Sequence, residues 1–416
     1  MASRALYHRF AETRLLDALT DSPIVLIHGP RQCGKTTLMR MIGDARGYTY
    51  FNFDDGVVRS AAEGDPLGFV MDLPPKVILD EVQHVPELFR ALKSRVDRER
   101  VPGQFLLIGS ANVLLLPRLA DSLAGRMALI RLFPMAQSEL GGRPTDFLAR
   151  LFRAQFKMRR VKRLGIDLAQ RIISGGYPAA LIRTTARRRT AWYRDYIETI
   201  VQRDVRDLAR IGSLDIMPRL LALTASQSAR LLNITDLAGP FQVSRPTIRD
   251  YVTLLERVFL LEELPPWHSN RLSRLIKTPK LHMADTGTAA AILGLDADAL
   301  MTDRMVLGQL LETFVYQELR RHASWREDDI RFHHFRDKDG YEVDIVLERG
   351  ARDVAGIEVK AAATVTAADF RGLRKLAVTA GDKFRAGVVL YDGEASVSFG
   401  NRMYAVPVRT LWEPGA

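Results

Sequence analysis

The stretch from Gly29 to Thr36 reads GPRQCGKT and fits the phosphate-loop pattern G-x-x-x-x-G-K-T. The apolar residues 24–27 before it predict a short buried strand, and residues 37–42 after it predict an amphipathic helix. The two glycines of the pattern let the backbone curl so that successive amide groups point inward, and the start of the helix adds the positive end of its dipole. The sequence therefore predicts an anion-binding loop between a strand and a helix.

The side chains of this loop predict which anion it holds. Lys35 is expected to reach the β and γ phosphates of a nucleoside triphosphate, and the Thr36 hydroxyl is expected to bind Mg2+. The other contacts are expected from backbone amides. The predicted nucleotide-binding set is Gly29, Pro30, Arg31, Gln32, Cys33, Gly34, Lys35, Thr36 and Thr37.

Two later strands are predicted to complete a nucleotide site. The apolar run from residue 76 ends in Asp80 and Glu81, as a buried parallel strand does when it delivers acids to its carboxyl edge. We expect Asp80 to hold Mg2+ and Glu81 to orient the attacking water. A third apolar strand, 105–108, is followed by Ser110, the candidate for sensing the γ phosphate, with Asn112 as second choice.

Arg126 is the last residue of this predicted catalytic set, which is Lys35, Asp80, Glu81, Ser110 and Arg126. It follows a loop in the segment SLAGR, and an arginine offered across a subunit boundary stabilises charge during phosphoryl transfer. Such a role requires a homo-oligomer. Spacing alone explains Arg126 equally well as one partner of a surface salt bridge.

Together with the phosphate loop, the segments LDEVQ (79–83), GS (109–110), LAGR (123–126) and GGYP (175–178) make the chain resemble a predicted prokaryotic AAA+ ATPase family with a C-terminal domain of unknown function. The resemblance covers nearly the whole chain. It implies ATP as the nucleotide, binding at the phosphate loop, and Mg2+ with water activation at Asp80 and Glu81. Cys33 is a less usual occupant of its loop position. Because that position needs only a backbone, Cys33 should not block nucleotide binding.

The amino-acid composition indicates the number of domains and the cellular compartment. A chain of 416 residues predicts two to four domains, and its single cysteine excludes an internal disulfide and favours a reducing compartment. The N-terminal residues lack the apolar core of a signal peptide, and no run of ~18 apolar residues occurs, so we expect a cytoplasmic protein without a membrane partner. The net charge of +11 gathers around residues 150–163, expected to be helical, and 183–189. Either a polyanion partner such as DNA or solvated helix faces would explain it.

The fold class expected is α/β: a P-loop NTPase of the AAA+ type with a helical lid, a winged-helix segment and a C-terminal α/β restriction-endonuclease-like domain. Alternating strands and helices end near residue 140 at a Gly-Gly-Arg-Pro turn, and helical spacing follows to about residue 228. The predicted divisions are 1–140 for the ATPase domain, 141–230 for the lid, 231–268 for the winged helix, 269–300 for a linker and 301–416 for the nuclease-like domain.

A helix-turn-helix pattern occurs within residues 231–264. A short capped helix begins after Asn233, and a second helix begins after a serine at position 244. Arg245, Thr247 and Arg249 would project from the start of the second helix, where a recognition helix meets the DNA major groove. This segment is similar to the winged-helix region of the same family, and winged helices also serve as protein-protein modules.

Two predicted strands near the C-terminus carry charged residues in alternation. Asp344 lies in one, and Glu358 and Lys360 share a face of the next. With Glu312 on a preceding predicted helix, this set resembles the active-site pattern of PD-(D/E)xK nucleases. The resemblance implies that Asp344 and Glu358 share Mg2+ and that Lys360 holds water or phosphate. Exposed charges on edge strands are the ordinary alternative, and folds of this type also serve as binding platforms.

Two hypotheses follow. In the first, an oligomeric ATPase couples Mg-ATP hydrolysis to DNA binding or remodelling through its winged helix and C-terminal domain. In the second, hydrolysis is slow and the protein is a nucleotide switch for a protein partner. A metal-dependent DNA nuclease regulated by ATP is a further alternative.

Overall fold

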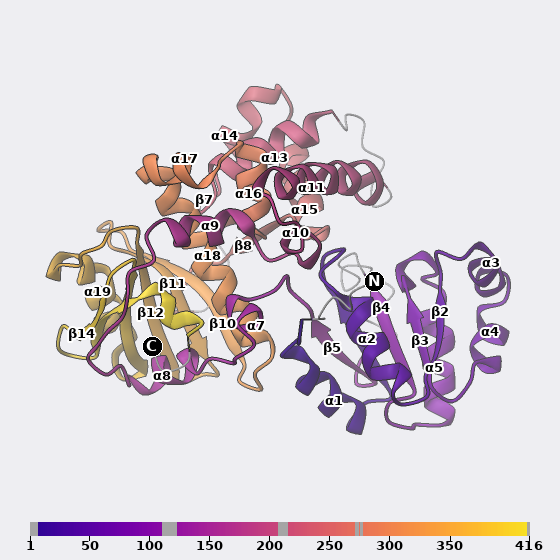
Figure 1. Cartoon of the computed structure of the whole chain (residues 1–416). Helices are drawn as coiled ribbons and strands as arrows, with labels where there is room; N and C mark the ends of the chain where they lie inside the picture. Colours follow the sequence, from indigo (N-terminus) through magenta and orange to yellow (C-terminus); the bar gives the residue numbers. More distant parts are fainter. Residues whose placement is uncertain (1–6, 110–122, 207–214, 271–273, 275–277, 414–416) are drawn as a thin grey trace.

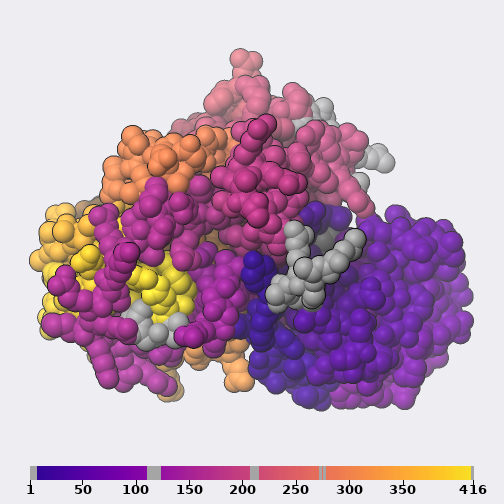
Figure 2. Space-filling model, in the orientation of Figure 1, coloured from indigo at the N-terminus to yellow at the C-terminus, as the bar shows by residue number. Residues whose placement is uncertain are grey.

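The computed structural model describes residues 7–109, 123–206, 215–270, 274 and 278–413. Figure 1 shows three parts: the N-terminal domain in indigo, a mainly helical middle part, and a C-terminal domain built on a large sheet. In the space-filling view of Figure 2, the N-terminal domain stands out as a lobe of its own beside the other two parts.

The N-terminal domain is a parallel sheet covered by helices on both faces. Its strand order is β2-β3-β4-β1-β5, and every neighbouring pair is parallel. One face packs against helices α1 and α2, and the other against α4 and α5, so two apolar cores flank the sheet. The elements are α1 Ala11–Asp21, β1 Ile24–His28, α2 Lys35–Asp44, β2 Thr49–Asn52, α3 Gly56–Gly64, α4 Pro66–Asp72, β3 Val77–Asp80, α5 Leu88–Arg98, β4 Phe105–Gly109 and β5 Met127–Arg131.

This arrangement confirms the expected α/β class with a parallel sheet. The strand predicted before the phosphate loop is β1, and the helix predicted after it is α2. The acid-ended strand is β3, and it lies two places from β1 with β4 between them. Because parallel strands end at one edge of the sheet, the loop after β1 and the acids after β3 face each other there.

The middle part combines helices with a small sheet. Helix α11 passes directly into a π-helical turn, Ile200–Val205, and strand β9 is the centre of a three-stranded antiparallel sheet in the order β7-β9-β8. Its elements are α7 Gln137–Leu140, α9 Ile166–Ser174, α10 Pro178–Leu181, α11 Ala186–Thr199, α13 Ile216–Ser226, β7 Arg230–Leu231, α14 Ile234–Ala238, α15 Arg245–Arg257, β8 Leu261–Leu264, β9 Lys280–Met283, α16 Thr286–Leu293 and α17 Ala297–Thr302.

The expected linker over residues 269–300 differs from the structure. This segment instead supplies β9, α16 and α17. Leu281 and Met283 of β9 are buried in the main apolar core, and Asp285 caps α16 by accepting a hydrogen bond from the Thr288 amide. A Pro-Pro-Trp sequence precedes the segment, but the elements beyond it pack against β8 and α13.

The C-terminal domain is a mixed seven-stranded sheet in the order β10-β11-β12-β13-β15-β14-β6. Strands β10 to β12 are antiparallel, whereas β12, β13 and β15 are parallel. Helices α8 and α18 contact the sheet at β12, and so does α19. The elements are α8 Phe147–Arg153, β6 Arg159–Arg160, α18 Arg304–Ser324, β10 Ile330–Arg336, β11 Glu342–Arg349, β12 Asp353–Lys360, α19 Arg371–Ala380, β13 Phe384–Tyr391, β14 Ala395–Ser398 and β15 Met403–Pro407.

The expected lid is therefore also divided differently. Residues 147–160 were assigned to it, but α8 packs on β13 and β6 pairs with β14, so both belong with the C-terminal sheet. The basic run expected to be helical is interrupted after α8. Arg159 and Arg160 lie in β6, and Arg163 forms an ion pair with Asp392. These partners lie more than two hundred residues away in the sequence, beyond the reach of any local pattern.

Candidate functional site

The phosphate loop connects β1 to α2 at the carboxyl edge of the sheet. Gly29 and Gly34 have φ values of 149° and 99°. A Cβ at position 29 would lie 2.1 Å from the Leu132 carbonyl oxygen, so this position requires glycine. The Lys35 ammonium donates to the carbonyl oxygens of Gly29 and Pro30 at 3.0 and 2.7 Å. Loop carbonyls thus hold the lysine at the mouth of the loop.

The residues expected to bind Mg2+ are in direct contact. The Thr36 hydroxyl donates to Asp80 Oδ2 at 2.8 Å, and the Tyr50 hydroxyl donates to the same oxygen at 2.8 Å. Burial raises the pKa of Asp80, although these two hydrogen bonds oppose the shift. A hydroxyl and a carboxylate oxygen are ligands that Mg2+ takes in phosphate-bound sites, so the residues present fit this cation. Tyr50 is a contact that the sequence analysis did not single out.

The side chains of Arg31 and Gln83 contact the Glu81 carboxylate. The Glu81 backbone lies in the left-handed region, with φ of 57°, which is uncommon for a residue with a side chain. Gln83 donates to one carboxylate oxygen, and Arg31 lies 3.6 Å from the other. Such a backbone conformation often marks a functional residue.

Arg31 joins the phosphate loop to the middle part of the chain. Its Nε donates to Asp204 Oδ2 at 2.7 Å, and Asp204 lies on the π-helical turn that follows α11. Burial alone would lower the pKa of Arg31, but Asp204 and Glu81 more than offset it and raise this pKa. From the sequence we expect only the backbone of Arg31 to bind nucleotide, whereas its side chain bridges Glu81 and Asp204.

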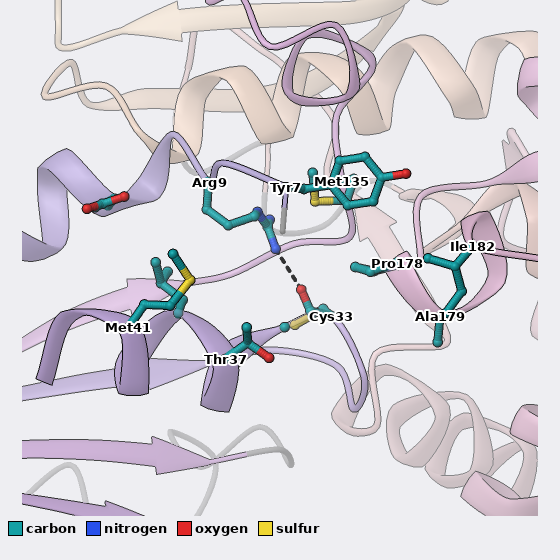
Figure 3. A pocket seen from close by; sticks show the side chains of 12 residues that line it. Tyr7, Arg9, Cys33, Thr37, Met41, Met135, Pro178, Ala179 and Ile182 are labelled. Carbon is teal, nitrogen blue, oxygen red and sulfur yellow. Dashed lines mark hydrogen bonds between the residues drawn. The ribbon is translucent and has the colours of Figure 1, made fainter. Parts of the chain in front are cut away.

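An apolar cavity of about 230 Å³ opens beside the phosphate loop (Figure 3). The N-terminal segment, the start of α2 and the helix α10 region enclose it. Arg9 crosses one wall, where its guanidinium donates to the Cys33 carbonyl oxygen at 2.6 Å and to the Phe133 carbonyl oxygen at 2.7 Å. The lining residues are Tyr7, Arg9, Glu12, Cys33, Gly34, Thr37, Leu38, Met41, Met135, Pro178, Ala179 and Ile182.

Arg126 lies at the opposite end of the sheet from the phosphate loop. It directly precedes β5, and its carbonyl oxygen accepts from the Ile24 amide at the start of β1. Its guanidinium forms an exposed ion pair with Asp97, with Nε and Oδ1 2.5 Å apart. The side chain therefore cannot reach the phosphate loop of its own chain. Ser110 and Asn112 lie outside the described residues.

The four residues predicted in the C-terminal domain lie on neighbouring elements around β11 and β12. Asp344 Oδ2 accepts from the Val359 amide at 2.9 Å, and the Lys360 ammonium lies 2.8 Å from Glu358 Oε1. Burial and the nearby Asp344 carboxylate raise the pKa of Glu312 to about 8, and burial likewise raises that of Glu358. Asp344 is the member whose pKa is lowered, because Lys280 more than offsets its burial.

Lys280 is the residue of this cluster that the sequence analysis missed. Its ammonium lies 2.7 Å from Glu312 Oε1 and 3.1 Å from Asp344 Oδ1. It stands in a segment assigned to a linker, thirty-two residues before Glu312. No spacing rule joins it to the acids, and only the sheet pairing of β9 brings it there.

The predicted DNA-contacting residues lie at the start of α15. Ser244 caps this helix by accepting from the Thr247 amide at 3.3 Å. Arg245 and Arg249 are exposed, and Arg249 forms an ion pair with Glu263 of β8 at 2.6 Å. Helices α14 and α15 pack together, and α15 contacts β8. The helix-turn-helix therefore carries a strand pair, of which β9 comes from the segment expected to be a linker.

Three family models match successive parts of the chain. Residues 21–141 match the AAA domain model, residues 165–299 match a domain of unknown function (DUF8612), and residues 307–411 match a second domain of unknown function (DUF4143). Uncharacterized proteins from Mycobacterium tuberculosis and Mycobacterium bovis are each 28% identical over 408 residues, covering 98% of this chain and 85% of theirs.

Solved structures give weaker likenesses. The Walker-type ATPase of Pyrococcus abyssi is 14% identical with a TM-score of 0.42, covering 69% of this chain and 96% of its own. The Thermotoga maritima RuvB Holliday junction branch migration motor is 17% identical with a TM-score of 0.30, covering 61% and 89%.

Within the described part of the chain, no helix combines the length and apolar character needed to cross a bilayer. The phosphate loop, the acid-ended strand beside it and the AAA domain match agree with one another. The N-terminal region of this chain is a P-loop ATPase domain of the AAA type.

Proposed function

We propose that the chain hydrolyses Mg-ATP and that hydrolysis drives rearrangement of its middle and C-terminal parts on DNA. The 2.8 Å hydrogen bond from Thr36 to Asp80 supports the hydrolytic half of the proposal, because these two residues are the expected magnesium ligands. Magnesium held there would offset phosphate charge during transfer. The lysine of the loop would leave its carbonyl partners to contact the phosphates.

Arg31 supports coupling between the nucleotide and the rest of the chain. It touches Glu81, the proposed water-orienting acid, and Asp204 on the π-helical turn. A triphosphate in the loop would compete with both carboxylates for this guanidinium. Release of Glu81 would let it orient water, and release of Asp204 would free the lid.

We further propose that the base of ATP enters the apolar cavity beside the loop. The cavity borders Gly34 and Thr37, so a nucleotide with its phosphates in the loop has its base within reach of this space (Figure 3). Apolar side chains such as Met41 and Ile182 line the cavity and would contact the base through packing rather than hydrogen bonds. Replacing Ile182 with Glu should weaken ATP binding without changing the phosphate loop.

Phosphate release by the purified full chain tests the hydrolytic proposal. Lys35→Ala should lower ATP affinity by about 10- to 100-fold, since a charged hydrogen bond contributes roughly 1.5 to 3 kcal/mol. Glu81→Gln should retain ATP binding and lose turnover. Lys76→Ala, at an exposed lysine before β3, is the matched control. Turnover by Lys35→Ala at the wild-type rate would contradict the proposal.

A homo-oligomer is part of the proposal, because Arg126 can act only on another chain. Its exposed position at the far end of the sheet supports this role. Arg126→Ala should leave ATP binding intact and abolish turnover. If the purified oligomer of this variant hydrolyses ATP normally, Arg126 is merely one half of a surface ion pair with Asp97.

DNA is the proposed partner because exposed cations gather on two parts of the chain. Arg245 and Arg249 stand at the start of α15, and helix α11 begins with arginines 187 and 188, both exposed. Cations in the first turn oppose the helix dipole, so a polyanion partner accounts for them better than helix stability does. Retention on DNA should fall steeply with salt, and Arg245→Ala with Arg249→Ala should weaken it further.

Arg59→Ala is the matched control for DNA retention, since Arg59 is an exposed arginine paired with Glu63 on α3 of the ATPase domain. Absence of retention at low salt, with ATPase activity intact, would favour the second hypothesis. In that case the protein would be a nucleotide switch for a protein partner, and the helix-turn-helix would bind that partner.

A further inference from the structure

In the acid cluster of the C-terminal domain, ammonium groups and one backbone amide already contact the carboxylates that would hold a divalent cation. The resemblance to PD-(D/E)xK nucleases implies Mg2+ held by Asp344 and Glu358. Both Asp344 oxygens have partners, Lys280 on one and the Val359 amide on the other, and Glu358 Oε1 faces Lys360. Among the described residues, no group of three or more potential ligand side chains is arranged to hold a metal.

Lys280 is fixed in this position by the sheet that carries it. It lies in β9, the central strand, where it is paired with Leu231 of β7 on one side and Leu264 of β8 on the other. Only 8% of its side chain is exposed. A backbone paired on both sides cannot shift to withdraw the ammonium without breaking two strand pairings.

Two ammonium groups offset most of the negative charge of the cluster without a metal. The carboxylates of Glu312, Asp344 and Glu358 face the ammonium groups of Lys280 and Lys360. Their formal sum is one negative charge. A divalent cation added to these five groups would leave a net positive charge in a buried site.

We propose that Lys280 takes the place of the divalent cation, so that the C-terminal acid cluster is a metal-free ion network joining the β7-β9-β8 sheet to the C-terminal domain. The inference concerns residues remote from the phosphate loop and does not depend on ATP hydrolysis. It also predicts that the protein does not cleave DNA in Mg2+ or Mn2+.

Binding of Mn2+ to the nucleotide-free full chain, followed by electron paramagnetic resonance, tests the proposal. The wild-type chain and Asp344→Asn should bind Mn2+ equally, because the cluster holds none. Lys280→Met should gain one site, and the double variant Lys280→Met with Asp344→Asn should lose it again. Methionine matches the length of lysine without its charge, and circular dichroism confirms that each variant is folded.

Three results would overturn the proposal. The first is a Mn2+ site in the wild-type chain that Asp344→Asn removes, and this comparison stands even if Lys280→Met fails to fold. The second is a folded Lys280→Met chain that gains no site, since the ammonium would then not be what excludes the metal. The third is plasmid cleavage by the wild type in Mn2+ that Asp344→Asn abolishes. Phosphate release from ATP, measured in parallel, reports separately on the proposed ATPase.

Discussion

Glu262 of β8 is the buried carboxylate that joins the three parts of the molecule. Its Oε1 lies 3.0 Å from an Arg131 nitrogen on β5 and 2.7 Å from an Arg320 nitrogen on α18. Gln317, also on α18, donates to its Oε2 at 3.3 Å. We predict that Glu262→Gln, which keeps the shape and removes the charge, destabilises the chain strongly because it leaves two partly buried guanidinium groups without their anion.

The size of this destabilisation follows from the pKa of Glu262. Burial alone would raise the pKa of Glu262, but Arg320 and Arg131 more than offset it and lower this pKa from 4.5 to about 2. At ~1.4 kcal/mol per pH unit, the lowered value corresponds to ~3 kcal/mol of stability. Because the pKa is lower in the folded chain, this stability is fully present above pH 4.5 and is lost as the pH falls towards 2.

Urea unfolding followed by far-UV circular dichroism measures the effect. At pH 7 and at pH 5, the free energy of unfolding of Glu262→Gln should be about 3 kcal/mol lower than that of the wild type. Below pH 4.5 this difference should shrink. Glu263→Gln is the matched control, since the neighbouring acid pairs with Arg249 at the surface and such pairs contribute about 0 to 1 kcal/mol. Equal unfolding curves for the two variants at pH 7 would show that the Glu262 charge does not stabilise the fold.

Other predictions concern packing and pH. Gly372→Ala should lower the melting temperature of the C-terminal domain, because the new Cβ would lie 1.8 Å from the Glu342 carbonyl oxygen. Gly308→Ala on α18 is the control, since its new Cβ would meet nothing within 4 Å and should not lower the melting temperature. Burial lowers the pKa of His282 to about 3, so the folded chain resists its protonation while the unfolded chain accepts it below pH 6.5. Between pH 7.5 and pH 5, the free energy of unfolding should therefore fall by about 2 kcal/mol less in His282→Gln than in the wild type. Urea unfolding at the two pH values measures this difference. An unchanged pH dependence would show that His282 is protonated in the folded chain.

The local parts of the ATPase site can be predicted from short stretches of the chain. The phosphate loop is specified by neighbours in the chain, because glycine at positions 29 and 34 fixes the backbone and Lys35 and Thr36 follow directly. Strand alternation likewise predicted β11 and β12, since side-chain direction in a strand repeats every two residues. These patterns depend on residues that lie a few positions apart, so they can be read directly from the sequence.

Contacts between groups far apart in the chain depend instead on how whole elements pack. Lys280 reaches Glu312 and Asp344 because β9 is paired on both sides, and Asp204 reaches Arg31 because α11 runs on as a π-helical turn. The assignment of residues 269–300 to a linker and of α8 and β6 to the lid was wrong for the same reason. Their partners lie far away in the sequence, and burial of apolar surface between whole elements, rather than local preference, selects those contacts.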